Sequence, residues 1–368
     1  MASDGCQPMG RPLYPVYGMR SFTNPHDQAV DSGPALVRSE PQRGTAKTGT
    51  WNGPAPVGSV APVPVDEVTA ITRPKPGPTD VLLKNDVRMP LLGFGTKAAT
   101  AASVKEAIEL GYKHFDCSPE YGNQAEIGKV IQSISRSQLF ISSKLPNQDH
   151  REAYEACRRT IQELGVDYLD LYVISWPIAW KKGTQDVDAE VTLQETWTQM
   201  EKLVEDGLVK NIGLANFSLP QVEQILGSCK IRPTVLQIEL HPLCAQRKMV
   251  GVCKRYGIQI AAHHPLGDAE VDNLKAEVVT AVASECKRSP AQVTLRWSVQ
   301  RMITVVVEAA STDEAKDFVG VNTFGLTNDE KRQLDTMDQN KRCYQPEWAV
   351  FADPEAGGAT KPSVVFGY

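Results

Sequence analysis

The sequence predicts an α/β protein whose main body is a (β/α)8 barrel that follows an extended tail rich in proline and glycine. Between residues 81 and 342, short β-like runs alternate with amphipathic helical segments eight times. Eight such units in about 260 residues have the size and order of a parallel barrel. The composition changes near residue 80, which separates the tail from the barrel, and residues 343–368 form a C-terminal segment.

Residues 1–80 have the composition of a low-complexity tail. They hold 13 of the 25 prolines and nine glycines, and no helical or strand period continues for more than a few residues. Such a composition is typical of an extended or disordered segment. Tyr14, Tyr17 and Phe22 could anchor this tail to another protein. Two hypotheses therefore stay open, a solvated tail and a segment that joins a protein assembly.

Charge and cysteine usage exclude several classes of protein. The net charge of −5 gives no general attraction to nucleic acid or to an anionic membrane. No run of 18 apolar residues is present, so no membrane span is expected, and the N-terminus lacks the apolar region of a secretory signal. The eight scattered cysteines form no CxxC pair, which favours reduced thiols, a cytoplasmic location and no metal site. A cleaved organelle peptide stays an alternative.

The first half of the barrel begins with a hairpin, in which 81–83 and 87–89 flank the turn at 84–86. The mostly apolar run at 169–175 is typical of a strand buried on both faces. Gly207 suits the end of a helix. The four expected strands are 91–96, 114–118, 139–144 and 169–175, and the helices that follow them are 103–111, 125–133, 153–164 and 193–206.

The second half repeats the same unit. Pro290 starts a new helix inside the helical region 271–301, because proline suits the first helical turn. Right-handed crossovers then make parallel closure the natural topology. The expected strands are 210–216, 235–240, 259–263 and 302–307, and the expected helices are one from 220, 247–256, the divided region 271–301, 313–319 and a last helix at 328–337.

Four segments follow barrel strands at the end where such barrels build their active sites. They are 93–96, 115–123, 142–145 and 175–177, and further matching motifs lie at 212–217, 237–242, 265–267 and 289–293. In this order and spacing, the chain resembles the aldo-keto reductases over most of its length after residue 80. The resemblance implies a TIM barrel that reduces carbonyl groups with NADPH or NADH.

The resemblance implies that Tyr121 donates the proton, with Lys144 and Asp116 as its supporting pair. A tyrosine with a pKa near 10 is a poor acid at neutral pH. A neighbouring ammonium favours the phenolate, so we expect Lys144 to lower the pKa of Tyr121. The alternative is that the barrel keeps a buried Asp–Lys pair for stability alone, because losing one partner leaves an uncompensated charge.

Ser175 stands where the family has a histidine that orients the substrate carbonyl. A serine hydroxyl can donate a hydrogen bond, but it is shorter and carries no charge. The loss of one well-placed donor costs on the order of 10²–10³ in rate. We therefore expect Ser175 to be a weaker substitute donor.

The nicotinamide end of the coenzyme site is also altered. The resemblance implies that Asn216 and Gln237 hold the carboxamide, although Ala215 replaces the usual serine. His263 replaces the tyrosine that stacks on the nicotinamide. Adjacent strand residues face opposite sides, so His263 and His264 are not expected to form a chelating pair. Three further residues of matching motifs are expected to bind coenzyme: Gly95, Thr96 and Leu266.

The adenosine end departs most from the family. Glu308 and Glu314 take the places of the lysine and arginine that bind the 2′-phosphate of NADPH. Anions repel a phosphate, whereas a carboxylate can accept a hydrogen bond from a ribose hydroxyl, so NADH is a conceivable coenzyme beside NADPH. A local shift of the alignment would make Lys316 the phosphate contact instead.

Three hypotheses about function follow. The first is a pseudoenzyme, non-catalytic or weakly active, that serves as a structural or assembly subunit and binds no coenzyme. The alternative is an NADPH- or NADH-dependent reductase of small carbonyl compounds that uses Tyr121. A regulatory subunit that senses a coenzyme is the third. The aromatic C-terminal segment 343–368 closes the substrate pocket or docks on a neighbour.

Overall fold

The computed structural model describes residues 73–268, 271–346, 348, 350–352 and 365–367. Eight parallel strands close into a barrel, in which β10 pairs with both β3 and β9, and the predicted fold class is confirmed. The barrel strands are β3 (Leu92–Gly95), β4 (His114–Asp116), β5 (Phe140–Leu145), β6 (Leu171–Ile174), β7 (Ile212–Ala215), β8 (Val235–Glu239), β9 (Gln259–His263) and β10 (Thr304–Val307).

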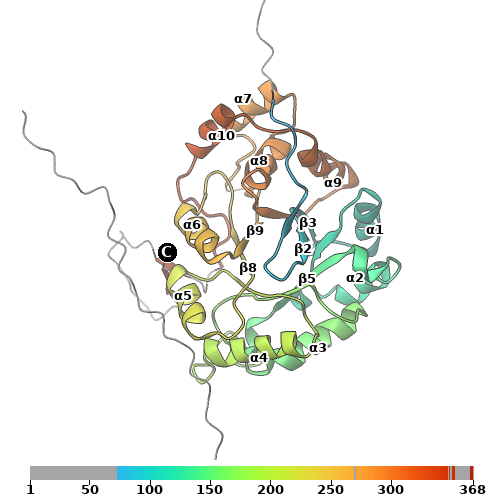
Figure 1. The fold of residues 1–368 in the computed structure, drawn as a ribbon, viewed down its shortest axis with the longest axis vertical. Coiled ribbons are helices and arrows are strands. Elements are labelled where there is room, and N and C mark those ends of the chain that lie inside the picture. The colour runs from blue at the N-terminus through green and yellow to red at the C-terminus, as the bar shows by residue number, and fades with distance from the viewer. Residues whose placement is uncertain (1–72, 269–270, 347, 349, 353–364, 368) are drawn as a thin grey trace, which may run out of the picture. The chain divides into compact units, whose positions relative to one another are not determined.

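Helices surround the strands, as the view in Figure 1 shows. Each packs apolar side chains into the core, and none in the described part of the chain is long and apolar enough to cross a membrane. The helices are α1 (Ala101–Glu109), α2 (Gln124–Ile131), α3 (Ala153–Leu164), α4 (Leu193–Glu205), α5 (Leu219–Ser228), α6 (Arg247–Tyr256), α7 (Glu277–Cys286), α8 (Pro290–Val299), α9 (Thr312–Val319) and α10 (Asn328–Asp335). Short 3₁₀ turns are η1 (Pro119–Tyr121), η2 (Arg136–Gln138), η3 (Asn147–Glu152) and η4 (Gly320–Thr323).

The start of the predicted helical region 271–301 is wrong. Helix α7 begins only at Glu277. Before it, the Asp272 carboxylate accepts hydrogen bonds from the backbone N–H groups of Leu274 at 3.0 Å and Lys275 at 3.2 Å. A side chain that caps the backbone in this way offers it an alternative to the helix, and the chain turns instead. The break before Pro290 is confirmed, because α8 starts there.

The predicted hairpin is confirmed and closes the amino-terminal end of the barrel. Strands β1 (Asp80–Leu82) and β2 (Arg88–Pro90) pair antiparallel. Leu83 and Met89 are buried in one cluster with Phe140, Leu171 and Val235 from the starts of the barrel strands. This apolar plug leaves the carboxyl ends of the strands as the open end, which is where a site can form.

The last residues of the predicted tail lie on the barrel. Arg73 forms an ion pair of 2.7 Å with Glu330 of α10, and a Cβ added at Gly325 would come within 2.6 Å of the Pro74 carbonyl oxygen. The expected boundary at residue 80 therefore falls within a docked segment. The anchors Tyr14, Tyr17 and Phe22 lie outside the described residues, so docking of the tail on a partner remains a prediction.

The C-terminal segment adds two short strands, β11 (Val350–Ala352) and β12 (Val365–Gly367), which pair parallel to each other. Before them, Tyr344 and Trp348 pack against Trp176 and Trp180, which follow the fourth barrel strand, β6. Tyr344 and Trp348 therefore lie over the carboxyl-terminal end of the barrel.

Candidate active site

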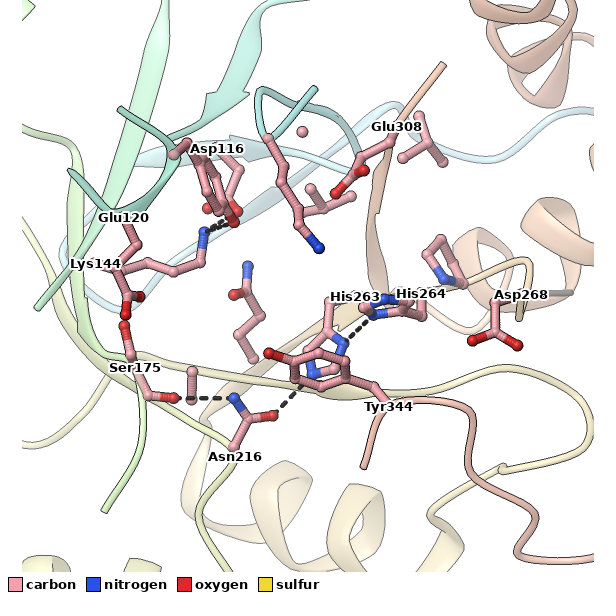
Figure 2. Close-up of a pocket in the computed structure, with 18 of the residues that line it drawn as sticks. Asp116, Glu120, Lys144, Ser175, Asn216, His263, His264, Asp268, Glu308 and Tyr344 are labelled. Atoms are coloured by element: carbon pink, nitrogen blue, oxygen red, sulfur yellow. Dashed lines mark hydrogen bonds and ion pairs between the residues drawn. The ribbon is translucent and has the colours of Figure 1, made fainter. Parts of the chain in front are cut away.

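A cavity of about 420 Å³ lies at the carboxyl ends of the barrel strands. Most residues that the sequence predicted for catalysis or coenzyme binding line it, whereas Thr96 and the alternative phosphate contact Lys316 do not. Figure 2 labels several of the lining residues, among them Asp116, Lys144 and Ser175. The predicted residues that it brings together are Gly95, Asp116, Tyr121, Lys144, Ser175, Asn216, Gln237, His263, Leu266 and Glu308.

Thr96 supports the site from behind instead of lining it. Its side chain is fully buried, and its hydroxyl donates a hydrogen bond of 3.1 Å to the main-chain carbonyl of Asp116. The backbone N–H of Thr96 donates to the same carbonyl at 3.1 Å. The structure thus gives Thr96 a structural role at the junction of β3 and β4.

Asp116, Lys144 and Tyr121 form one connected group. Asp116 ends β4, and Lys144 lies on the neighbouring β5, where its ammonium pairs with the Asp116 carboxylate. The Lys144 Nζ lies 3.3 Å from the Tyr121 hydroxyl and 3.2 Å from the Cys117 carbonyl oxygen. The Ser142 hydroxyl donates to Asp116 at 2.7 Å, which fixes the carboxylate on its other side.

The turn that presents Tyr121 follows from local sequence. Ser118 caps the 3₁₀ turn η1, because its hydroxyl accepts a hydrogen bond from the Glu120 N–H at 3.3 Å. Pro119 suits the first position of the turn, and Gly122 ends it with a φ of 68°, in the region that favours glycine. Tyr121 is therefore held at the cavity wall by a short, self-capped turn.

Lys144 has the expected lowering effect on the pKa of Tyr121, but burial outweighs it. Burial raises the pKa of Tyr121, and Lys144 opposes this only in part, so the net pKa lies above its usual range. For Lys144, burial alone would lower the pKa, but Asp116 and Tyr121 outweigh it and raise the pKa. The group therefore consists of a charged lysine beside a tyrosine that keeps its proton at neutral pH.

Ser175 presents an unsatisfied hydroxyl to the cavity. Its residue surface is only 4% exposed, and within the described chain its Oγ has no hydrogen-bond partner. A buried hydroxyl without a partner loses about 1–3 kcal/mol of hydrogen bonding relative to water. A substrate oxygen in the cavity would recover that interaction, which fits the predicted role of a substitute donor.

Asn216 and the two histidines form a chain of hydrogen bonds, visible in Figure 2. The Asn216 Nδ2 donates to the Ser175 carbonyl at 2.9 Å, and the His263 Nε2 lies 2.8 Å from the Asn216 Oδ1. The Nδ1 atoms of His263 and His264 lie 2.8 Å apart. The expectation that these histidines face opposite sides is wrong, because β9 ends at His263 and His264 has a φ of 47°, which breaks the strand alternation.

The residues predicted to bind a coenzyme fit a carboxamide better than a 2′-phosphate. The Gln237 side chain lines the cavity, and among the described residues nothing is hydrogen bonded to its amide, so it can pair with a carboxamide. At the other end, a Cβ added at Gly95 would come within 3.1 Å of the Glu308 Cγ, so Glu308 borders the cavity beside the glycine. Glu314 instead accepts from the Ala310 N–H at 2.8 Å. Lys316 does not line the cavity.

The cavity also contains residues that the sequence analysis did not place. Trp176 and Pro265 belong to the motifs at 175–177 and 265–267, so the sequence contained a signal that could have predicted their place in the cavity. The path of the C-terminal segment, which brings Tyr344 onto the His264 ring at 4.9 Å between centroids, has no local signal. The lining residues missed by the sequence analysis include Lys97, Glu120, Trp176, His264, Asp268 and Tyr344.

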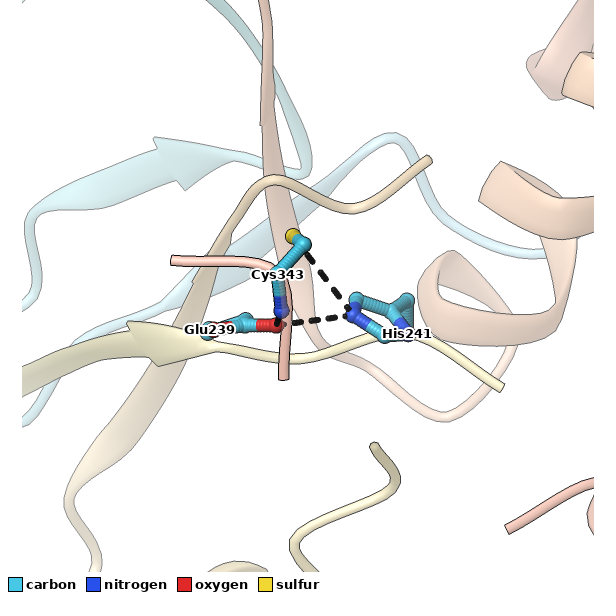
Figure 3. A group of neighbouring side chains, drawn as sticks. All are labelled: Glu239, His241 and Cys343. Carbon is cyan, nitrogen blue, oxygen red and sulfur yellow. Dashed lines mark hydrogen bonds and ion pairs between the residues drawn. The ribbon is translucent and has the colours of Figure 1, made fainter. Parts of the chain in front are cut away.

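Glu239 anchors the C-terminal segment beside the cavity (Figure 3). Its carboxylate accepts hydrogen bonds from the backbone N–H groups of Cys343 at 2.7 Å and Tyr344 at 3.1 Å, and from the His241 Nε2 at 3.0 Å. Glu239, His241 and Cys343 could in principle share a metal ion, since their ligand atoms lie within 4.8 Å of one another. The carboxylate is already bonded on both oxygens, and the Arg342 guanidinium lies 3.8 Å from it, which disfavours a second cation.

Comparison with known proteins gives a consistent result. The profile of the Aldo/keto reductase family matches residues 93–339. Aldo-keto reductase family 1 member A1 of Sus scrofa is 35% identical over 300 residues, which cover 73% of this chain and 92% of the relative. The protein of that name from Gallus gallus is 34% identical over 316 residues, 78% of this chain and 97% of its own. The solved aldose reductase from Schistosoma japonicum has a TM-score of 0.69 at 36% identity and covers 72% of this chain and 94% of its own.

The barrel is closed and parallel, and its cavity at the carboxyl ends of the strands is lined by polar groups. The chain is therefore a (β/α)8-barrel protein with a candidate site at the strand ends. Within that class, the chain belongs to the aldo-keto reductase family, since the family match spans more than half of it and the relatives are matched over most of their length.

Proposed function

We propose that the protein is a carbonyl reductase that uses NADH or NADPH, with Tyr121 as the proton donor. The observation that carries this proposal is the 3.3 Å contact between the Lys144 Nζ and the Tyr121 hydroxyl, inside a cavity that also holds the paired Asp116. The relatives are named as reductases, which favours this function over a purely structural one.

Four residues of the chain have separate roles in the proposed reaction. A nicotinamide coenzyme would supply the hydride when bound. Tyr121 donates its proton to the carbonyl oxygen of the substrate, and the Lys144 ammonium stabilises the phenolate that remains. Asp116 holds the ammonium in place, because the two groups are paired across β4 and β5. Ser175 donates its free hydroxyl to the same substrate oxygen.

The coenzyme that we favour is NADH. Gln237 and Asn216 would hold the carboxamide, and His263 would stack on the nicotinamide in place of a larger ring. Glu308 lines the cavity where a cation would be needed for a 2′-phosphate, and a carboxylate there accepts a hydrogen bond from a ribose hydroxyl instead. Apolar and aromatic carbonyl compounds suit the cavity wall at Trp176 and Tyr344, which is backed by Trp348.

The experiment is a kinetic comparison of the purified chain with its Tyr121→Phe variant, using NADH, NADPH and a set of aromatic aldehydes. The variant keeps the ring but lacks the acidic proton, so kcat should fall by about 10²–10⁴-fold with little change in the thermal midpoint. Equal activity in both proteins would refute the assignment of Tyr121. A Tyr172→Phe variant serves as the control, because Tyr172 is buried and does not line the cavity.

A second candidate function is a non-catalytic assembly subunit. Ser175 and Glu308 favour it, because they line the cavity at positions where the family has a histidine and a lysine. The cavity therefore lacks one long donor and one positive charge. Under this hypothesis, Ser175→His alone should not produce activity, and the N-terminal tail should carry the interaction with a partner. Deletion of residues 1–72 would then leave a folded barrel that no longer enters its complex.

A further inference from the structure

Glu120 presents an unpaired carboxylate to the cavity. It lines the cavity beside Tyr121, its neighbour in the turn η1, and its surface is open to solvent. The hydrogen bond of Glu120 to Ser118 uses the backbone N–H. Within the described part of the chain, nothing is hydrogen bonded to or ion-paired with the carboxylate, and Figure 2 draws no dashed line to it. This carboxylate is therefore available to a ligand.

The charged groups close to Glu120 already have partners of their own. Burial raises the pKa of the Glu120 carboxyl, Lys144 lowers it in part, and Asp149 adds to the rise. The Lys144 ammonium is paired with Asp116, and Asp149 forms an ion pair of 3.0 Å with Arg159. Among the described residues, Glu120 therefore contributes a negative charge to the cavity wall that no ion pair neutralises.

Aromatic rings belong to the same part of the cavity wall. Trp176 and Tyr344 line the cavity with ring centroids 5.9 Å apart, and Trp348 packs edge-on against Trp176 at 4.8 Å. Burial raises the pKa of Tyr344, and the nearby charge of Glu120 raises it further. Aromatic rings attract an ammonium group over their faces, and the methyl groups of a quaternary ammonium bury apolar surface against them. A carboxylate beside such rings suits an organic cation.

A cation held by Glu120 would lie close to the reacting carbonyl group. Tyr121 and Ser175, the two proposed donors to the substrate oxygen, line the same cavity as Glu120, and Tyr121 follows Glu120 directly in the chain. Consecutive Cα atoms are about 3.8 Å apart. A substrate that reaches both side chains of this turn therefore needs only a short spacer, such as one aromatic ring, between its carbonyl and its charge.

We propose that Glu120 is a specificity-determining residue that selects carbonyl compounds carrying an ammonium group, with Trp176 and Tyr344 as the aromatic part of the same subsite. The proposal rests on the proposed reductase function, which it extends by naming the class of substrate. A substrate that carries a carboxylate is repelled by Glu120. The ammonium group takes no part in the reaction, in which the carbonyl group gains a hydride and the proton of Tyr121 to become an alcohol.

The test compares two para-substituted benzaldehydes of the same shape, one with a trimethylammonium group and one with an uncharged tert-butyl group. The full chain and its Glu120→Gln variant are assayed at pH 8 with NADH and NADPH. Each aldehyde is compared with itself in the two proteins, so differences in intrinsic reactivity cancel. Glu109→Gln is the matched control, because Glu109 is exposed at the end of α1 and does not line the cavity. The thermal midpoint checks that both variants are folded.

A second readout does not depend on turnover. Phenyltrimethylammonium has the ring and the charge of the cationic aldehyde but no carbonyl group, and calorimetry measures its Kd. It should bind the full chain and the Glu109→Gln variant, and it should bind Glu120→Gln about three- to thirtyfold more weakly. Equal affinity for the full chain and Glu120→Gln would count against a cation subsite.

The expected kinetic result is a change in selectivity. The ratio of kcat/KM for the ammonium aldehyde to kcat/KM for the tert-butyl aldehyde should fall about three- to thirtyfold in Glu120→Gln and stay at the wild-type value in Glu109→Gln. The same ratio in the wild type and Glu120→Gln would overturn the role of Glu120, while reduction of both aldehydes would still support the proposed function. Reduction of neither aldehyde with either coenzyme would contradict the proposed function and this extension of it.

Discussion

At the scale of single residues, the site could be predicted where a residue's place at the end of a barrel strand is enough to put its side chain in the cavity. Asp116 ends β4, Tyr121 follows it and Lys144 lies on β5, and barrel geometry brings such positions together. Thr96 and His264 could not be placed, for different reasons. Thr96 turns inward to bond the Asp116 carbonyl, and His264 enters the cavity because one backbone angle, a φ of 47°, interrupts the strand alternation.

The charge at Glu308 should decide which coenzyme is preferred. We expect Glu308→Lys to tighten NADPH binding by about tenfold to a hundredfold, since an ammonium replaces a carboxylate near the 2′-phosphate. NADH affinity should change much less. Fluorescence titration with both coenzymes measures the ratio.

Asp313→Lys is the matched control for this change. It makes the same change of charge on the nearby α9, but Asp313 does not line the cavity. A similar gain in NADPH affinity from both variants would show a general charge effect and contradict the role assigned to Glu308.

At the scale of elements, the position of the C-terminal segment depends on the carboxylate of Glu239. Burial alone would raise the pKa of Glu239, but the His241 hydrogen bond, the Cys343 N–H and the positive charge of Arg342 lower it to about 2. The pKa of Glu239 is therefore lower in the folded chain than in the unfolded chain. The Glu239 carboxylate contributes its full stabilisation above the ordinary pKa of about 4.5, and this stabilisation is lost as the pH falls toward 2.

Glu239→Gln should therefore destabilise the chain by about 1.5–3 kcal/mol at pH 7, because it weakens charge-assisted hydrogen bonds to two backbone N–H groups. Urea unfolding measures the change. In a chain truncated after Arg342, the same substitution should cost less, because the two N–H groups are gone. An equal cost in both backgrounds would mean that Glu239 does not act through the C-terminal segment.

The order and boundaries of the elements followed closely from hydrophobic period and turn residues. Helices α3 and α6 occupy the predicted ranges, and α8 begins at Pro290 as expected. The start of α7 was missed because a single side chain, Asp272, caps the backbone locally. The C-terminal cover was left open because its position depends on a long-range bond between Glu239 and the Tyr344 backbone, which no local pattern encodes.

At the scale of the whole molecule, buried histidines should limit stability in mild acid. Burial lowers the pKa of His114 and of His150, each to about 4. The unfolded chain binds these protons near pH 6.5, so the folded state loses stability as the pH falls from 6.5 to 4 and keeps it above 6.5. Each histidine can account for up to about 3 kcal/mol of this loss.

Urea unfolding at pH 8, 6 and 5 tests this prediction. The free energy of unfolding should stay nearly level above pH 7 and fall below pH 6.5. His150→Asn should reduce the slope, because His150 does not line the cavity and its imidazole lies 3.4 Å from the Thr196 hydroxyl on α4. A stability that is constant down to pH 5 would show that these histidines are not held neutral.

The central claim is that the barrel transfers a hydride from a bound coenzyme to a carbonyl group. The most direct measurement uses NADH or NADPH carrying deuterium at C4 and an aromatic aldehyde, with mass spectrometry of the alcohol. The account predicts an alcohol with one added deuterium in the wild-type chain and a large loss of this product in Tyr121→Phe. An absence of labelled alcohol with both coenzymes would contradict the claim and favour the assembly subunit.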